Sequence, residues 1–309
     1  MLRVKKYILI LFTIFLSANV FAGSFVVQSD DQNIMLGRHL HYLEDAAAQL
    51  SLKDFLQPKY QGLLKPSKVL TPNFGSTDSV YWYMIDLRSS GNERKMILQI
   101  DYPLLDLIDI YFLKEGRVIR DEHLGDRKVF NNRPIYHRNF LLNLNLDYDE
   151  ELKIVFRVKT TSAHKFGMSL HETVSFWQQD AQEIMVQGIF FGVMVVMIFY
   201  NVFIYITLRN PAYLFYIISV LGFVFVQLAL SGFGQQYVWP DRTLWNEYVL
   251  LLGAFIAVLG FDNFTNLFLD LRNRLPVFSK LIGIHGAGSA LLYISTFFIR
   301  RQNSQITIF

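Results

Sequence analysis

Three acidic side chains that lie close together in the sequence are the first candidates for chemistry. Asp101, Asp106 and Asp109 fall within one short segment, and two carboxylates facing each other across a cleft are what glycoside hydrolysis requires. The segment leads directly into a predicted strand, however, and a solvated strand edge or turn accounts for the same spacing. We therefore expect no catalytic pair among these residues.

Four side chains are candidates for ligand binding. The ring face of Trp82 can stack on a sugar ring while polar neighbours bind its hydroxyls. Asp106, His137 and Arg138 offer polar groups, and the last two suit an anionic or hydroxylated ligand. A second interpretation stays open, in which Trp82 fills the core of a β-sandwich and His137 and Arg138 lie in an exposed loop.

Metal binding and covalent catalysis find little support. His39 and His41 can share one face of a strand, but no third ligand follows at a recognised spacing and there is no HExxH motif. The chain has no cysteine, which excludes disulfides, iron–sulfur clusters, thiolate zinc sites and cysteine nucleophiles. The sequence also lacks phosphate-binding glycine loops, kinase motifs and serine elbows. We expect no metal, no cofactor and no enzymatic activity.

The composition indicates two regions of different character. The 309 residues are 52% hydrophobic and 16% aromatic, which is too apolar for an ordinary soluble protein, yet the first half is rich in charge. The formal net charge is +3, and the basic residues are scattered. Nucleic acid is therefore not an expected partner.

Residues 1–22 have the composition of a secretory signal peptide. Basic residues near the start are followed by an apolar run over residues 7–16 and by a small-residue ending at Ala22, where we expect cleavage. An uncleaved anchor helix is the alternative. In either case the following residues leave the cytoplasm, and we expect them in the periplasm of a bacterium.

Residues 23–176 show the period-two alternation of β-strands. Tyr81, Tyr83 and the apolar residues that continue this spacing fall on one face of a strand. Turn-forming pieces separate the strands without intervening amphipathic helices, which favours an antiparallel sandwich. Ser51 and Asp54 have capping-box spacing and predict a short helix. The predicted strands cover residues 79–88, 95–101, 107–113, 139–146 and 152–158.

Residues 184–208 are predicted to form a membrane-spanning helix, because they carry no charge and about 20 apolar residues suffice to cross the hydrocarbon core. Gly188 and Gly192 form a GxxxG pair, and Asn201 lies on nearly the opposite side. Two faces that favour protein contact indicate a bundle of packed helices. Within residues 177–309, three further helices are predicted at 213–233, 248–269 and 281–299.

Basic residues in the links between these helices give an orientation. Arg209 follows the first helix, and Arg272, Arg274 and Lys280 follow the third. The positive-inside rule places both links in the cytoplasm. The domain of residues 23–176 is then periplasmic, and the chain is a multi-pass protein of the bacterial inner membrane.

Asp262 and Asn266 share one face of the third predicted helix. An ionisable side chain at membrane depth is costly, so we expect Asp262 to face other helices or water and to couple helix movement to signalling. The alternative is that the helix ends earlier and that Asp262 reaches the lipid headgroups.

The end of the sequence is at odds with this topology. A fourth helix directed outward places Arg300 and Arg301 on the outer side, and residues 302–309 contain no domain. As a hypothesis, we interpret the chain as a truncated or frame-shifted copy of a longer protein.

The order of these features resembles that of the bacterial seven-transmembrane receptors with diverse intracellular signalling modules. The resemblance covers nearly the whole mature chain. Each motif alone is loose, but their order is fairly specific. The matching pieces are YLED at 42–45, LSLKDF at 50–55, YW at 81–82, YPLLDLIDIY at 102–111, GD at 125–126, RP at 133–134, HRNF at 137–140, the glycines at 188 and 192, YN at 200–201 and the tyrosines at 213 and 216.

This resemblance implies an extracellular sensor domain of jelly-roll type that binds carbohydrates or related small ligands. It also implies seven helices and a cytoplasmic output, which in the family is a histidine kinase, a diguanylate cyclase or a phosphatase. The sequence departs from the pattern, because it predicts four helices and no output domain.

We interpret the chain as a multi-domain protein, an all-β periplasmic jelly-roll-like sandwich followed by an all-α transmembrane bundle. It acts as a receptor that senses a small, carbohydrate-like ligand and passes occupancy to the helices. Its expected partners are that ligand, the lipid bilayer, and a cytoplasmic signalling protein or a second copy of the chain. The alternatives are a transporter-associated substrate-binding component and a carbohydrate-binding membrane anchor that does not signal.

Overall fold

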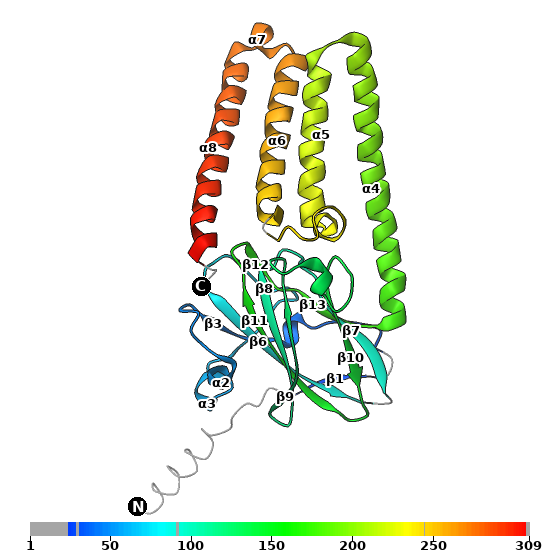
Figure 1. Ribbon diagram of the computed structural model, residues 1–309, viewed down its shortest axis with the longest axis vertical. Coiled ribbons are helices and arrows are strands. Elements are labelled where there is room, and N and C mark those ends of the chain that lie inside the picture. Colours follow the sequence, from blue (N-terminus) through cyan, green and yellow to red (C-terminus); the bar gives the residue numbers. More distant parts are fainter. Residues whose placement is uncertain (1–23, 29–30, 91–92, 244, 307–309) are drawn as a thin grey trace, which may run out of the picture.

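The alternating residues near Tyr81 build the central strand of a β-sandwich, β6 (Val80–Ser89). The computed structural model describes residues 24–28, 31–90, 93–243 and 245–306. The predicted signal peptide lies outside the described residues. Figure 1 shows the strands gathered at one end of a set of long helices, with the short helix α7 (Leu271–Arg274) at the opposite end.

The two main sheets of the sandwich are formed mostly by antiparallel pairs. The larger sheet has seven strands in the order β4-β3-β6-β11-β8-β9, with β1 added in parallel to β6. Its further strands are β1 (Phe25–Val27), β3 (His41–Asp45), β4 (Lys65–Pro66), β8 (Leu107–Lys114), β9 (Arg117–Leu124) and β11 (Glu151–Lys159). The smaller sheet, in the order β10-β7-β13-β2, contains β2 (Asn33–Met35), β7 (Arg94–Ile100), β10 (Phe140–Leu146) and β13 (Met168–Glu172). A separate pair consists of β5 (Asn73–Ser76) and β12 (Ala163–Lys165).

Alternate residues of both sheets build the main core. Tyr83 and Leu87 of β6 belong to one buried cluster with Leu98 of β7 and Leu142 of β10. This confirms the predicted inward face of β6 and the predicted sandwich, because side chains two residues apart on a strand share a face. Short 3-10 turns complete the loops, namely η1 (Gly37–His39) and η2 (Phe130–Asn132).

A second, smaller core covers the outer face of β6. The short helix α2 (Leu52–Phe55) has the predicted capping box, with the Asp54 N–H donating to Ser51 Oγ over 3.2 Å. The helix stacks Phe55 on Trp82 with ring centroids 4.9 Å apart, and both side chains are fully buried. The prediction that Trp82 stacks on a ligand is therefore wrong, because Phe55 already covers its ring. Helix α3 (Pro58–Gln61) follows.

The hairpin of β8 and β9 shows what the sequence pattern missed. Glu115 and Gly116 have φ angles of 51° and 75°, and two successive positive φ angles are typical of a tight hairpin turn. Strand β9 after this turn was not predicted. Most side chains of β9 are exposed because it is an edge strand, so it lacks the apolar alternation by which a half-buried strand is detected.

Within the described part of the chain, four helices of membrane length follow, as predicted. The first begins at Thr173, well before predicted residue 184, because its first turns lie against the sandwich, where polar side chains find partners. A one-turn π-helix, η3 (Gly234–Val238), follows the second. The four helices are α4 (Thr173–Leu208), α5 (Pro211–Leu230), α6 (Trp245–Phe268) and α8 (Pro276–Ile306).

Glycine allows close packing between α5 and α6. A Cβ atom on Gly222 would collide with the backbone of Ala257, and the hydroxyl of Ser219 donates to the Ala257 carbonyl over 2.9 Å. The predicted packing pair, Gly188 and Gly192, has open space where a Cβ atom would stand. The prediction that these two glycines pack helices within the described chain is therefore wrong, since small residues bring helices together only where a second backbone lies near.

Candidate functional site

The loop before β10 and the first turns of α4 are joined by a buried ion pair. Nη1 of Arg138 lies 2.7 Å from Oδ1 of Asp180, and Nη2 lies 2.9 Å from Oε2 of Glu183. Asp180 and Glu183 are three residues apart on α4 and so project from one side of the helix. Arg138 and Asp180 are almost completely buried, whereas Glu183 is half exposed.

His137 completes this network in a defined tautomer. The backbone N–H of Asn139 donates to its Nδ1 over 3.1 Å, so the neutral ring carries its proton on Nε2. That nitrogen lies 3.0 Å from Oδ1 of Asp180 and can donate to it. Burial lowers the pKa of His137 even though Asp180 favours the charged ring. The edge of the ring packs against Phe176 of α4.

Arg133 joins the same loop to the link between α5 and α6. Its Nη1 donates to the carbonyls of His137 and Arg138, and its Nη2 donates to Oε1 of Gln235 over 2.7 Å. The guanidinium lies 4.3 Å from the centroid of the Phe130 ring, where a cation gains from the ring electrons. Burial lowers the pKa of Arg133 to about 10, so it stays charged at neutral pH.

The link between α5 and α6 makes further contacts with the sandwich. The hydroxyl of Tyr136 donates to the Gln236 carbonyl over 2.8 Å, and the N–H of Phe130 donates to the Pro240 carbonyl over 3.2 Å. Gly232 has a φ angle of 76°, and a Cβ atom there would stand 2.9 Å from the Arg138 carbonyl oxygen. The sandwich is therefore fixed both to α4 and to the link between α5 and α6.

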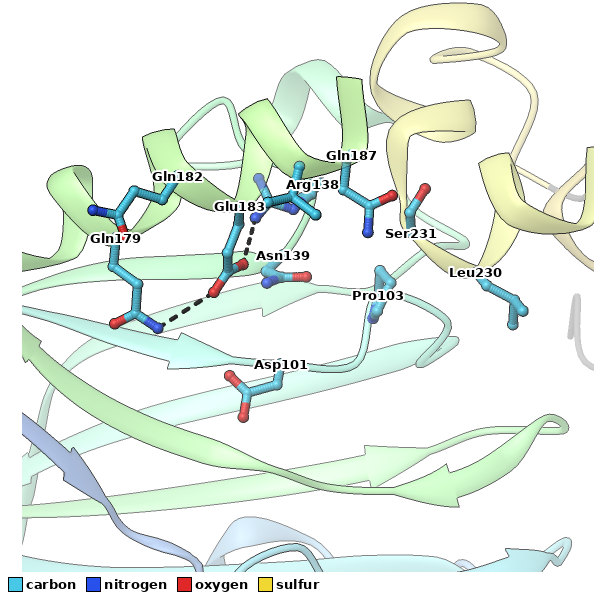
Figure 2. A pocket seen from close by; sticks show the side chains of 11 residues that line it. Asp101, Pro103, Arg138, Asn139, Gln179, Gln182, Glu183, Gln187, Leu230 and Ser231 are labelled. Atoms are coloured by element: carbon cyan, nitrogen blue, oxygen red, sulfur yellow. Dashed lines mark hydrogen bonds and ion pairs between the residues drawn. The ribbon is translucent and has the colours of Figure 1, made fainter. Parts of the chain in front are cut away.

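A cavity of about 570 Å³ lies at this junction (Figure 2). Its walls come from the ends of β7 and α5, from the loop before β10 and from α4. Glu183 is held by Arg138 and by Nε2 of Gln179, which donates to Oε1 over 3.3 Å. The lining residues are Asp101, Pro103, Arg138, Asn139, Gln179, Gln182, Glu183, Val186, Gln187, Leu230 and Ser231.

Asp101 forms the sandwich side of the cavity. Burial raises the pKa of its carboxyl to about 6, and the charge of Glu183 adds to this, whereas the hydrogen bond from Ser169 and the charge of Lys165 oppose it. The Ser169 hydroxyl donates to Oδ1 of Asp101 over 3.3 Å and lies 2.8 Å from Nε2 of His171. A short polar chain thus leads from the cavity into the sandwich.

The other predicted site residues of the sandwich lie elsewhere. Asp106 is buried and accepts from the hydroxyls of Thr160 and Thr161 and from the backbone of Thr161, so it braces the chain after β11 and does not face the cavity. Asp109 pairs with His123 on β9. The three acidic residues considered for catalysis thus occupy three separate environments.

His137 and Arg138 are the predicted ligand-binding residues that the structure brings together with the cavity. Arg138 lines it, and His137 supports Asp180 behind it. The alternative that both lie in an exposed loop is wrong, because both are buried. Sequence reasoning missed Asp180 and Glu183, although two acidic residues just before an uncharged apolar run were a usable signal.

The predicted residues of the membrane region make separate contacts. Oδ2 of Asp262 lies 2.9 Å from Nδ1 of His285 on α8, so Asp262 faces a neighbouring helix. Oδ1 of Asn266 is buried and accepts no hydrogen bond. Asn201 donates to the Met197 carbonyl of its own helix. Within the described residues, no group of three potential metal ligands is found, at His39 and His41 or elsewhere.

A β-sandwich joined by buried contacts to helices of membrane length defines the class of protein as a membrane protein with a folded domain beside its helices. A family model described as 7TMR-DISM extracellular 2 matches residues 37–172, and another described as 7TM diverse intracellular signalling matches residues 183–309. The chain belongs to the seven-transmembrane receptors with diverse intracellular signalling modules, as the resemblance predicted. It is a membrane receptor with an extracellular domain. A search of curated proteins gives no match.

The two matched ranges leave the first turns of α4 between them. Asp180 lies in this interval, whereas its partners His137 and Arg138 lie in the extracellular domain. The junction site is thus assembled across the boundary of the two family domains, so neither domain alone contains it.

Proposed function

We propose that this receptor senses a small, hydroxyl-rich, carbohydrate-like ligand and passes its occupancy to the membrane helices through the junction. The observation that carries the proposal is the buried ion pair of Arg138 and Asp180. Removing one partner of a buried pair leaves an uncompensated charge and costs about 3–5 kcal/mol. The loop before β10 and the start of α4 therefore move together.

The attachment to the link between α5 and α6 supports the same proposal. Arg133 binds both the backbone of the loop before β10 and the side chain of Gln235. A ligand that shifts this loop changes contacts to α4 and to α5–α6 at once. For such a switch the ligand needs different affinities for two arrangements of the helices. A passive anchor needs one linker, and it has no use for two buried attachments.

The proposed orientation puts the sandwich in the periplasm and the helices in the inner membrane of a bacterium. Four basic residues support it, because they lie at the helix ends away from the sandwich, and basic residues are enriched on the cytoplasmic side. We assign no catalysis to the described chain itself. The signal is read by a cytoplasmic output element. The four residues are Arg209, Arg272, Arg274 and Lys280.

The polar lining of the cavity supports a hydroxyl-rich ligand. Asn139, Gln179, Gln182 and Gln187 contribute amides. Each amide offers both donors and acceptors, which suits neighbouring hydroxyl groups. A cavity of about 570 Å³ is in the range of small-molecule sites.

The test uses the full chain in lipid nanodiscs. A panel of sugars, amino sugars and polyols is screened by thermal shift. Spin labels on Thr207→Cys and Asn273→Cys report the spacing of α4 and α7 at the end away from the sandwich, and the absence of native cysteine makes both labels specific. We expect a stabilising compound to change the distance distribution. A panel without any stabilising compound, or binding without a change in spacing, would contradict the proposal.

A further inference from the structure

The junction cavity has an excess of negative charge. Arg138 is the one cation among its lining residues, and it is shared by Asp180 behind the wall and Glu183 on the wall. Asp101 accepts a hydrogen bond from Ser169, and among the described residues no cationic group lies within ion-pair distance of it. Lys165, which acts on Asp101 from farther away, is exposed and does not line the cavity.

Two carboxylates face one space from two domains. Figure 2 shows the carboxylate of Glu183 on α4 and that of Asp101 at the end of β7 on facing sides of the cavity. Oε1 of Gln187 is buried and receives no hydrogen bond, which is costly for an amide oxygen removed from water. The Gln187 oxygen therefore lacks a donor. The two carboxylates do have donors, but Arg138, which also pairs with Asp180, is the one cation on the cavity wall to balance their charge. A donor with positive charge therefore suits all three acceptors.

The cavity also lies at the level where the helices enter the lipid. Val186 and Leu230 contribute apolar wall next to the polar residues, at the sandwich ends of the apolar runs of α4 and α5. A group that enters from solution and the headgroup of a lipid can both reach this level.

We infer that the junction cavity binds the ammonium group of a primary amine, held between the carboxylates of Asp101 and Glu183 with Gln187 as a third acceptor. The amides around it bind hydroxyl or ester oxygens of the same molecule. The ammonium is carried either by a free hydroxylated amine, such as an amino sugar, or by the ethanolamine headgroup of a lipid. This inference rests on the proposed function, because it names the ligand class of the same junction.

The experiment compares matched probes on the full chain. In phosphatidylcholine nanodiscs, glucosamine and ethanolamine are compared with glucose and N-acetylglucosamine by thermal shift and calorimetry. In a second arm, phosphatidylethanolamine replaces part of the phosphatidylcholine without added ligand. Asp101→Asn and Glu183→Gln each remove one charge at constant size. Glu93→Gln, at an exposed position just before β7, is the control.

We expect the amines to stabilise the chain and the two neutral sugars to have no effect at the same concentration. Asp101→Asn and Glu183→Gln each weaken amine binding by about tenfold or more, as expected for the loss of a charged hydrogen bond, while Glu93→Gln binds like the parent. Stabilisation by the free amines identifies a soluble ligand. Stabilisation by phosphatidylethanolamine alone, lost in Asp101→Asn, identifies the lipid.

Two results overturn the inference. One is that neither amines nor phosphatidylethanolamine stabilise the chain. The other is that their effect persists in the Asp101→Asn, Glu183→Gln double variant. A neutral sugar that binds this double variant and still changes the spacing of the labelled helices overturns the inference alone, since the proposed function then stands.

Discussion

Arg138, two residues before β10, and Asp180, in the second turn of α4, form an ion pair of 2.7 Å that is buried on both sides. The pair connects an extracellular domain to the helix that carries the chain into the membrane. His137 also contacts Asp180, and Glu183 also pairs with Arg138, so the joint is a network and not an isolated contact. Breaking such a pair would leave a buried charge without a partner or solvent, so both side chains favour one geometry.

Arg138→Ala should therefore destabilise the joint strongly. It leaves the carboxylate of Asp180 buried without its cation, and we expect a loss of about 3–5 kcal/mol in the free energy of unfolding. Hydrogen exchange of the first turns of α4 should rise along with it. Arg88→Ala is the matched control, because Arg88 pairs with Asp149 at the surface, where an ion pair contributes little. Equal effects of the two replacements would show that the joint is not built on this pair.

Asp101→Asn should stabilise the chain above pH 6. The folded state holds the Asp101 proton more tightly than the unfolded chain, because its pKa rises from the ordinary value of 3.8 to about 6. The stability of the parent therefore falls as pH rises from about 4 to about 6, by roughly 2–3 kcal/mol before solvent screening is discounted. The charged groups that act on Asp101 are Glu183 and Lys165, and the neutral Ser169 hydroxyl binds it.

Denaturant unfolding of the full chain at pH 4 and pH 7.5 checks this prediction. Asp101→Asn should match the parent at pH 4 and exceed it at pH 7.5, whereas Glu93→Gln should follow the parent at both values. A variant that loses stability at pH 7.5 would mean that the Asp101 carboxylate is satisfied in the free chain. Such a gain in stability at a ligand site is common, because groups that bind a ligand are often kept in positions that lower the stability of the free protein.

The fold was predictable where burial of one face of an element gives its apolar residues a regular spacing in the sequence. The two faces of β6 follow from alternation, and the capping box marks α2. What covers the outer face of β6 was not predictable, because it depends on where the short helix with Phe55 packs. That placement decides that Trp82 is a core residue and not a ligand platform.

Only the loop residues of the junction site were predicted from the sequence. His137 and Arg138 stood out as polar residues in a loop, but their partners Asp180 and Glu183 follow more than forty residues later, with separations of 43 and 45. Period and spacing report on neighbours within one element. They carry no information about which loop meets which helix, so the cavity could not be foreseen.

The two kinds of glycine in the membrane region lead to a paired prediction. Gly222→Ala should destabilise the bundle, since its Cβ atom collides with the Ala257 backbone of α6, whereas Gly188→Ala should leave a monomer unchanged because the space beside it is open. Thermal unfolding in nanodiscs compares the two variants. Cross-linking adds a second measure, because a loss of dimers in Gly188→Ala would assign the open glycine face to contact between two copies of the chain.

Asp262 and His285 allow the coupling within the membrane to be tested. Their 2.9 Å contact joins α6 to α8, beside a cavity of about 440 Å³ that is lined mainly by apolar residues of α4, α5 and α6. His285→Leu removes the partner of Asp262 and leaves a carboxyl group in apolar surroundings, which is costly at this depth. Asp262→Asn keeps an oxygen that can accept from His285, so it should be milder.

Thermal midpoints in nanodiscs rank these two variants, and the spin labels on residues 207 and 273 measure whether helix spacing still responds to a stabilising ligand. We expect the response to weaken in His285→Leu and to be nearly retained in Asp262→Asn. Ser295→Ala is a suitable control on α8, because the Ser295 hydroxyl donates to the Leu292 carbonyl of its own helix. An unchanged response in His285→Leu would exclude this pair from the path between the sandwich and the far ends of the helices.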